Sequence, residues 1–379
     1  MLRRTRRTAL VPAILGLMLF ALGSMDAGLV YAAEGCSASV LFTASPLDLK
    51  NIDFIHALGG LNPPGHVFPT DHIYFYMPRD AAGIPHVVPF YAPGAMVISS
   101  VSASQHVKAG FTDFNLELTP CDGVTVVFMH VSTLDPGIFG DTTSFDGWDL
   151  TNEYSTGGET YRLWRKNTSI EVFSGQELGT TGGRRGQYAL DLGVYDSRRP
   201  ARNVANPSRW GNSRVVTAVC PFDYYADSSL RNALLDLVER DGGREDPNRC
   251  GAVFQDVPDT AQGAWFLAGI SNTYPEDPHL ALVYSNTHPT EAVFSVGTSI
   301  PNLSSGLYEF TPTSSGVLNR AFSDVRADGT IYGYQVGRYG GVILISMPDN
   351  DTLWIEALAS ASSNPTSWAF TSRKTIFRR

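Results

Sequence analysis

Histidine and acidic residues occur at three places where they could form one metal site. His66, Asp71 and His72 lie within seven residues. His130 follows an apolar run, and Asp191 stands between two leucines. Imidazole nitrogens and carboxylate oxygens are ligands that zinc uses in hydrolytic sites, where a further histidine often assists. The sequence therefore predicts a hydrolytic metal site, provided that these segments meet in space.

Each of these residues also has an ordinary structural interpretation. His66 follows a Pro-Pro-Gly run and could be a loop histidine, and His130 could be a hydrogen-bonded residue of the core. A carboxylate flanked by apolar residues, such as Asp191, must face water, a cation or a hydrogen-bonding partner. His279 also lies beside an apolar run and is a minor ligand candidate.

The segments around these residues resemble, in their order, the lysostaphin/LytM-like metalloendopeptidases, which cut peptide cross-links of bacterial cell walls. In that family a His-x3-Asp pair precedes a strand, and a hairpin of the form V-x-A-x-x-G-x-V follows. A later strand ends in His-Leu-Ser, and a G-x-x-I-G-x-x-G turn leads to a strand that carries His-x-His. The chain is similar over roughly residues 60–196, in segments 65–72, 87–97, 128–132, 174–183 and 189–195.

The resemblance implies a role for each candidate residue. His66 and Asp71 match the first two zinc ligands, and Asp191 matches the third. His130 matches the catalytic histidine that does not bind the metal. His72 is an alternative ligand if the loop is read in another register. The implied cofactor is zinc or another divalent metal.

Three departures from the family pattern bear on activity. The first two ligands are separated by four residues rather than three, and Asp191 replaces an imidazole with a carboxylate. Ala189 stands where the family has its second catalytic histidine. A second carboxylate makes a metal-bound water less acidic and favours harder ions. The sequence therefore predicts that the chain binds a divalent ion but hydrolyses peptides slowly or not at all.

Short apolar and alternating runs between glycine and proline turns predict a mainly β chain. We expect a lysostaphin-like β-barrel or sheet domain, followed by a second β-rich domain with one amphipathic helix. The predicted boundaries are 1–32 for a signal peptide, 33–212 for the metallopeptidase-type domain and 213–379 for a β-rich C-terminal domain of unknown role. The apolar spacing predicts a helix over about residues 228–240 with Asp227 as its N-cap, and a short helix over about residues 47–58.

The first 32 residues read as an export signal, with four arginines before an apolar run. We therefore expect a secreted, periplasmic or cell-surface protein without a transmembrane anchor in its mature form. The whole chain has a net charge of −9, which argues against a nucleic-acid partner. Hydrophobic residues make up 43% of the chain and charged residues 17%, so it can bury a large core.

Four cysteines in an exported chain indicate disulfide bonds. They allow three pairings. We favour Cys220 with Cys250, because they bracket the predicted helix, and Cys36 with Cys121 by elimination. Metal binding by cysteine is disfavoured, since no Cys-x-x-Cys pair occurs.

The function expected from these features is that of an exported, metal-binding protein with a divergent zinc-metallopeptidase-like domain and weak hydrolysis of cell-wall peptides. If the chain is an enzyme, it is a metal-dependent endopeptidase. The alternative is a catalytically inactive protein that binds cell-wall glycan or peptide, or a structural surface protein.

Overall fold

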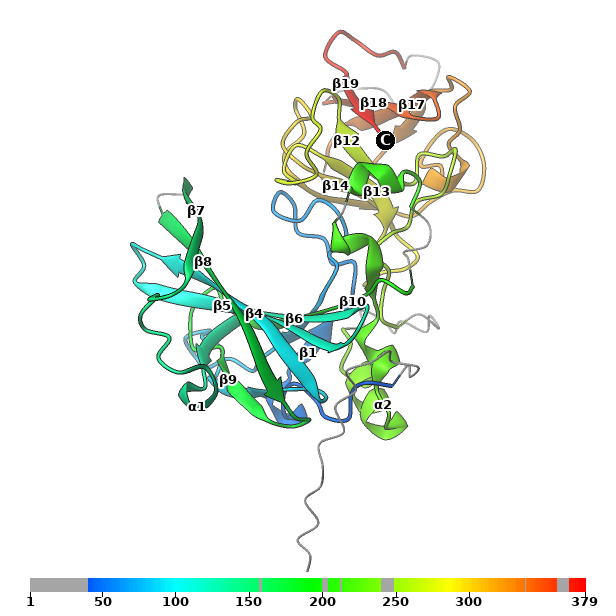
Figure 1. The fold of residues 1–379 in the computed structure, drawn as a ribbon. Helices are drawn as coiled ribbons and strands as arrows, with labels where there is room; N and C mark the ends of the chain where they lie inside the picture. Colours follow the sequence, from blue (N-terminus) through cyan, green and yellow to red (C-terminus); the bar gives the residue numbers. More distant parts are fainter. Residues whose placement is uncertain are drawn as a thin grey trace, which may run out of the picture. The chain divides into compact units, whose positions relative to one another are not determined.

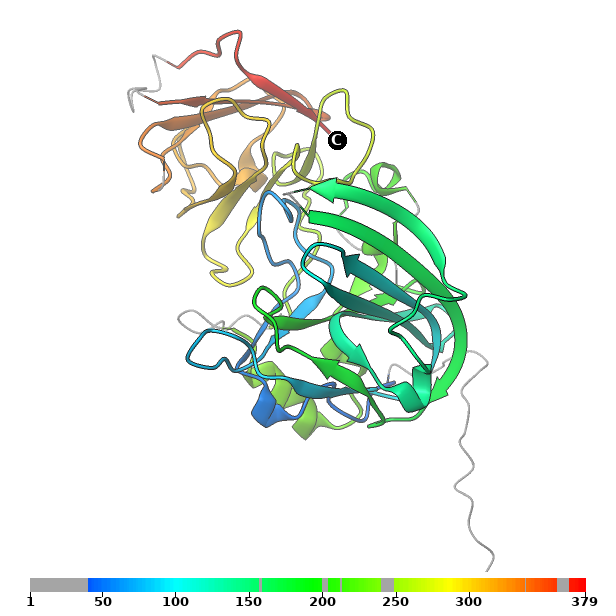
Figure 2. The same ribbon diagram turned by 90° about the vertical axis from the view of Figure 1, so that its left-hand side faces the viewer.

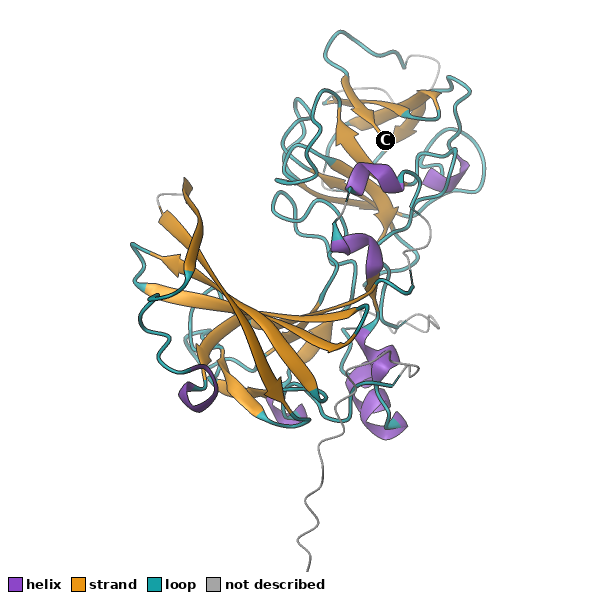
Figure 3. Ribbon diagram, in the orientation of Figure 1, coloured by secondary structure: helices purple, strands orange, loops and turns teal. Residues whose placement is uncertain are grey.

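The computed structural model describes residues 40–156, 159–199, 204–211, 213–239, 249–337, 339–359 and 368–379. The predicted signal peptide and Cys36 lie outside these ranges. Strands dominate the described residues and form two antiparallel sheets (Figures 1 and 3). The prediction of a mainly β fold is confirmed.

The first sheet has eleven strands and curves strongly along its long strands (Figure 2). Its hydrogen-bonded order is β1-β2-β10-β6-β5-β4-β8-β7, with β11 beside β10 and β9 joining β3 to β6. The strands are β1 (Phe54–His56), β2 (Ile73–Tyr76), β3 (Val88–Tyr91), β4 (Met96–His106), β5 (Phe111–Cys121), β6 (Val124–Leu134), β7 (Asp149–Thr156), β8 (Glu159–Val172), β9 (Glu177–Thr181), β10 (Ala189–Asp196) and β11 (Ala218–Val219).

The second sheet has eight strands in the order β15-β14-β13-β12-β19-β18-β17-β16. These strands are β12 (Gly263–Leu267), β13 (Leu280–Tyr284), β14 (Ala292–Val296), β15 (Gly306–Phe310), β16 (Tyr332–Tyr334), β17 (Val342–Asp349), β18 (Thr352–Leu358) and β19 (Thr375–Arg378). Its core includes the rings of Phe294, Phe322 and Tyr334, which are fully buried.

The helices are short and lie between strands. They are η1 (Leu49–Asn51), α1 (Pro136–Phe139), η2 (Pro207–Trp210), η3 (Arg214–Thr217), η4 (Pro221–Tyr224), α2 (Ser228–Asp236) and η5 (Phe322–Asp324). Asp227 caps α2 by accepting a hydrogen bond from the Ser229 backbone N–H, as predicted. Within the described ranges, no helix is long and apolar enough to cross a membrane.

The helix predicted over residues 47–58 is wrong. Only Leu49–Asn51 is helical there, as a single 3-10 turn, and residues 54–56 form β1. Phe54 and Ile55 pair with β2, where the Phe54 ring stacks on Tyr76 at 4.4 Å. Aromatic and β-branched residues suit such pairing, so the sheet overrides the helical spacing.

Alternation along the central strands of the first sheet separates an apolar face from a polar one. On β5, Phe114, Leu116 and Leu118 are buried, whereas the intervening Asp113, Asn115 and Glu117 are only half-buried. Successive residues of a strand point to opposite faces. The apolar face packs into the first hydrophobic core, and the other face carries the polar side chains discussed below.

A disulfide joins Cys220 to Cys250, with the Cα atoms 5.8 Å apart, which confirms the pairing predicted from the sequence. None of the cysteines in the described residues is free. Cys36, the predicted partner of Cys121, is not among them.

Asp196 at the end of β10 should contribute to stability at neutral pH. Its carboxylate accepts hydrogen bonds from Arg198 at 2.8 Å and from the Tyr224 hydroxyl at 2.6 Å. The Arg198 hydrogen bonds are the main cause that lowers the pKa of Asp196 to about 2. We expect Asp196→Asn to lower the free energy of unfolding at pH 7 by about 1–2 kcal/mol.

Urea unfolding across pH tests this prediction. Because the pKa is lowered on folding, the contribution is present above the unfolded value of about 3.9 and is lost as the pH falls toward 2. The difference between parent and Asp196→Asn should therefore shrink below pH 4. Asp122→Asn, which changes an exposed carboxylate in the turn after β5, is the control. An equal difference at pH 7 and pH 2.5 would contradict the assignment.

Candidate functional site

Asp191 is the centre of the site because β10 lies between β2 and β6. It stands opposite Tyr74 of β2 and Met129 of β6. Its side chain is only 2% exposed, and its Oδ1 atom has no hydrogen-bond partner among the described residues. A buried, unpaired carboxylate oxygen is costly, so a water molecule, a ligand or a cation at this position would stabilise it.

Two imidazoles flank this carboxylate. The Nε2 atoms of His72 and His130 each lie 3.4 Å from Asp191 Oδ2. The Nδ1 atoms of the same rings contact two other carboxylates, Asp71 at 2.8 Å and Asp113 at 2.9 Å. In a neutral ring whose Nδ1–H donates to a carboxylate, Nε2 is left as an acceptor or metal donor, whereas a protonated ring donates from both nitrogens. The result is an alternating chain of three carboxylates and two imidazoles.

A bulge in β6 orients His130. Val131 pairs with Phe114 and Phe128 pairs with Leu116, so two residues of β6 face one residue of β5. His130 is the bulged residue and has a left-handed φ of 64°. Such a conformation is unfavourable for a non-glycine residue and needs support from its surroundings. The His130 carbonyl provides it by accepting hydrogen bonds from Thr181 at 2.9 Å and Gln187 at 2.7 Å.

Asp71 contacts His72 and Tyr195 rather than Asp191. One oxygen contacts His72, and the other accepts a hydrogen bond from the Tyr195 hydroxyl at 2.9 Å. Burial alone would raise the pKa of Asp71, but the contacts with His72, Tyr195 and nearby Arg214 lower it. Asp71 is therefore ionised at neutral pH and holds the His72 ring in place.

His66 lies beside this cluster on a loop closed by paired backbone hydrogen bonds with Asn62, both 2.9 Å long. Its ring is 6.0 Å from the His72 ring, centroid to centroid. Burial, followed by the electrostatic effect of the neighbouring His72 ring, lowers the pKa of His66. A neutral imidazole is the form that binds a metal.

The electrostatics of the centre favour an added positive charge. Burial raises the pKa of Asp191 to about 6, although His130 and His72 oppose the shift. Burial would lower the pKa of His130, but the hydrogen bond with Asp113 and the charge of Asp191 raise it to about 9. Protons on these groups compensate the clustered carboxylates, and a divalent cation could do the same.

The distances between donors allow a test of metal fit. Two ligands bound to one zinc ion at tetrahedral angles lie about 3.4 Å apart, which is the separation of Asp191 Oδ2 from each Nε2 atom. Carboxylates behind both rings match the usual support of histidine ligands. In the described part of the chain, however, no three acidic, histidine or cysteine side chains converge as a ligand set. Asp191 Oδ2 and one Nε2 atom are spaced so that both could bind the same ion. A third donor would have to move toward them to complete the site.

Two contributors were not foreseen from the sequence, namely Asp113 and Tyr195. Asp113 belongs to the alternating polar residues of β5, and that period-two pattern is the signal that could have indicated it. Tyr195 lies four residues after Asp191 on β10, so both point to the same face. By contrast, His279 is a buried residue just before β13, whose Nδ1 atom accepts a hydrogen bond from the Leu267 N–H at 3.1 Å.

The structure therefore brings Asp191 together with His72 and His130, and places His66 beside His72. Asp71 contacts His72 rather than Asp191. Ala189 pairs with Tyr76 on β2. No protein-family model, curated protein or solved structure matches the chain.

Proposed function

We propose that the chain is an exported protein whose first sheet holds a divalent ion at Asp191, in a divergent lysostaphin/LytM-like domain that hydrolyses cell-wall peptides slowly or not at all. The observation that carries the proposal is the buried Asp191 carboxylate, which lies 3.4 Å from two imidazole Nε2 atoms and has one oxygen without a partner in the described part of the chain. Zinc is the first candidate ion.

The contacts favour His72 over Asp71 as a ligand. Both carboxylate oxygens of Asp71 are engaged, one by His72 and the other by Tyr195. The Nε2 atom of His72, in contrast, faces Asp191. His66 is the candidate third donor, because its ring lies near that of His72 and its pKa is lowered. Two imidazoles and one carboxylate form a donor set that hydrolytic zinc sites use. The proposed ligands are thus His66, His72 and Asp191.

The chemistry that a bound zinc ion supplies is the acidification of a water molecule and the polarisation of a carbonyl group. His130, half-exposed and backed by Asp113, has a pKa of about 9 and is protonated at neutral pH, so it can donate a proton beside that position. Ala189 has no titratable group, so this position, where the family has its second catalytic histidine, supplies no second proton donor. This asymmetry is why we expect ion binding to be stronger than catalysis.

The absence of a proton-transferring group at Ala189 also favours a second function, the binding of cell-wall peptide or glycan without cleavage. The two functions share the ion site and differ in turnover. An enzyme of ordinary efficiency turns over on the order of 1–10³ times per second. We expect a turnover below this range on cross-bridge peptides.

Paired substitutions at the two flanking histidines test the assigned roles. In calorimetric titrations of metal-stripped protein with zinc at pH 7, we expect one ion per chain. His72→Gln should weaken binding by about 100-fold, because a ligand is lost. His130→Gln removes only a neighbour of the ligand Asp191, so it should weaken binding by no more than about tenfold, and it should abolish any residual peptide cleavage.

Three results would contradict the proposal. If His130→Gln weakened zinc binding as much as His72→Gln, His130 would be a ligand and the roles would be wrong. If the parent protein did not bind zinc or another divalent ion, the site itself would be wrong. Turnover of cross-bridge peptides at ordinary enzymatic rates would contradict the prediction of weak catalysis.

A further inference from the structure

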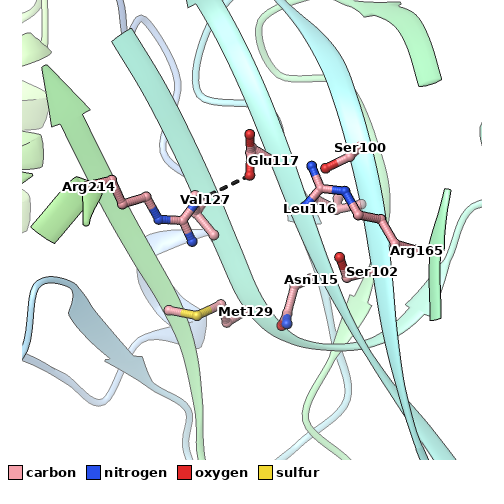
Figure 4. A pocket seen from close by; sticks show the side chains of 9 residues that line it. All are labelled: Ser100, Ser102, Asn115, Leu116, Glu117, Val127, Met129, Arg165 and Arg214. Atoms are coloured by element: carbon pink, nitrogen blue, oxygen red, sulfur yellow. Dashed lines mark hydrogen bonds and ion pairs between the residues drawn. The ribbon is translucent and has the colours of Figure 1, made fainter. Parts of the chain in front are cut away.

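A pocket of about 410 Å³ lies on the polar face of the first sheet (Figure 4). Hydroxyl, amide and charged side chains line most of it, namely Ser100, Ser102, Asn115, Glu117, Arg165 and Arg214. Its volume falls in the range of small-molecule sites. Its lining differs from the usual largely apolar one, so a ligand must be recognised by hydrogen bonds and charge.

The strand register accounts for the convergence of these side chains. Ser102 of β4 stands opposite Asn115 of β5 and Arg165 of β8, and Ser100 stands opposite Glu117. Directly paired residues of antiparallel strands point to the same face. The pocket is therefore built on rigid strands, and only Arg214 reaches it from outside the strands, on η3.

The two arginines of the pocket differ in whether they form an ion pair. Arg214 contacts Glu117 at 3.1 Å and lies 4.8 Å above the Tyr195 ring, so its charge is neutralised and its position is fixed. Arg165 is exposed and has a long hydrogen bond to Asn167 at 3.4 Å. Among the described residues it makes no ion pair, and Figure 4 shows its guanidinium group extended over the pocket. The pocket thus has one arginine that makes no ion pair with a described residue, although Asp149 of β7 stands opposite it.

The pocket adjoins the Asp191 centre along the same face of the sheet. Met129 lines the pocket and is the residue that pairs with Asp191 across β6 and β10. A ligand that fills the pocket would therefore extend toward the two imidazoles. The pocket itself uses none of the proposed ion ligands.

We propose that this pocket is a subsite for a carboxylate group on a peptide, with Arg165 as its anchor. A planar guanidinium group matches a carboxylate through two parallel hydrogen bonds. Asn115 and Ser102 can satisfy peptide amide groups next to that carboxylate. Glu117 opposes ligands of higher charge, such as a phosphate dianion. The carboxylate could belong to an acidic side chain or to a peptide C-terminus.

Peptide binding to metal-stripped protein tests the proposal separately from the ion site. The probes are acetyl-Gly-Gly-Glu-Gly-amide, acetyl-Gly-Gly-Gly-Gly with a free C-terminus, and the neutral acetyl-Gly-Gly-Gln-Gly-amide. We expect at least one carboxylate peptide to bind about tenfold more tightly than the neutral one. The preferred probe identifies the source of the carboxylate. Arg165→Gln should remove this preference, and Arg165→Lys should restore it only in part.

Arg162→Gln is the matched control, because Arg162 lies on the same strand and pairs with Glu153; it should leave binding unchanged. Equal binding of neutral and charged peptides would overturn the proposal, as would an Arg165→Gln variant that binds like the parent. Inorganic phosphate binding more tightly than either carboxylate peptide would also overturn it. Asp191→Asn should lose zinc but keep the peptide preference, so failure of the ion site and failure of this subsite are distinguishable.

Discussion

Replacing Asp191 with asparagine should weaken zinc binding by about 100-fold or more, while leaving the metal-free fold intact. The substitution keeps the size of the side chain but removes the charge on which the proposed site depends. Changes to residues that merely support a ligand typically cost 10–100-fold in metal affinity, so loss of a ligand should cost at least as much. Calorimetric titration of metal-stripped parent and variant with zinc measures the effect.

The stability of the same variant separates a ligand from a structural carboxylate. Burial raises the pKa of Asp191 to about 6, which means that the charged form is unfavourable in the folded protein. A neutral amide removes that penalty, so the free energy of unfolding without metal should fall by less than about 1 kcal/mol. A large loss of stability with unchanged zinc affinity would show that Asp191 is structural.

Phe128→Ala should lower the free energy of unfolding by about 3–5 kcal/mol. The Phe128 ring is fully buried directly behind the site and makes an edge contact with Phe90, with centroids 5.5 Å apart. It also stands opposite Leu192 on β10. Truncation leaves a cavity between the strands that carry His130 and Asp191. Urea unfolding followed by tryptophan fluorescence measures the loss.

Phe173→Ala is the matched control for this prediction, because the Phe173 side chain is 52% exposed. Its loss should change the free energy of unfolding by no more than about 0.5 kcal/mol. If the two variants were equally stable, the apolar face of the first sheet would not be the core that the packing indicates.

Much of the fold could be predicted from local signals. The Asp227 cap and the amphipathic spacing after it predicted α2, although the helix ends at Asp236, earlier than expected. The bracketing of that helix by Cys220 and Cys250 predicted their disulfide. The segment 47–58 could not be assigned in this way, since its pairing with β2 depends on residues about twenty positions later.

The candidate site shows a similar division. His130 and Asp191 stood out as polar residues within apolar strands, and the structure places those strands side by side. The sequence could not show whether Asp71 or His72 is the ligand next to Asp191. The choice depends on Tyr195, which lies far along the chain and engages Asp71. Likewise, the contact between Asp113 and His130 depends on a bulge in the β5–β6 pairing, which no local pattern specifies.

The most direct test of the account is the location of a bound ion in crystals. Diffraction data from zinc-soaked crystals, collected on both sides of the zinc absorption edge, would place the ion by its anomalous signal. The account predicts one strong peak about 2.0–2.2 Å from Asp191 Oδ2 and from the Nε2 atom of His72, with His66 as the third protein donor. No peak at Asp191, or a peak coordinated by residues outside this cluster, would contradict it.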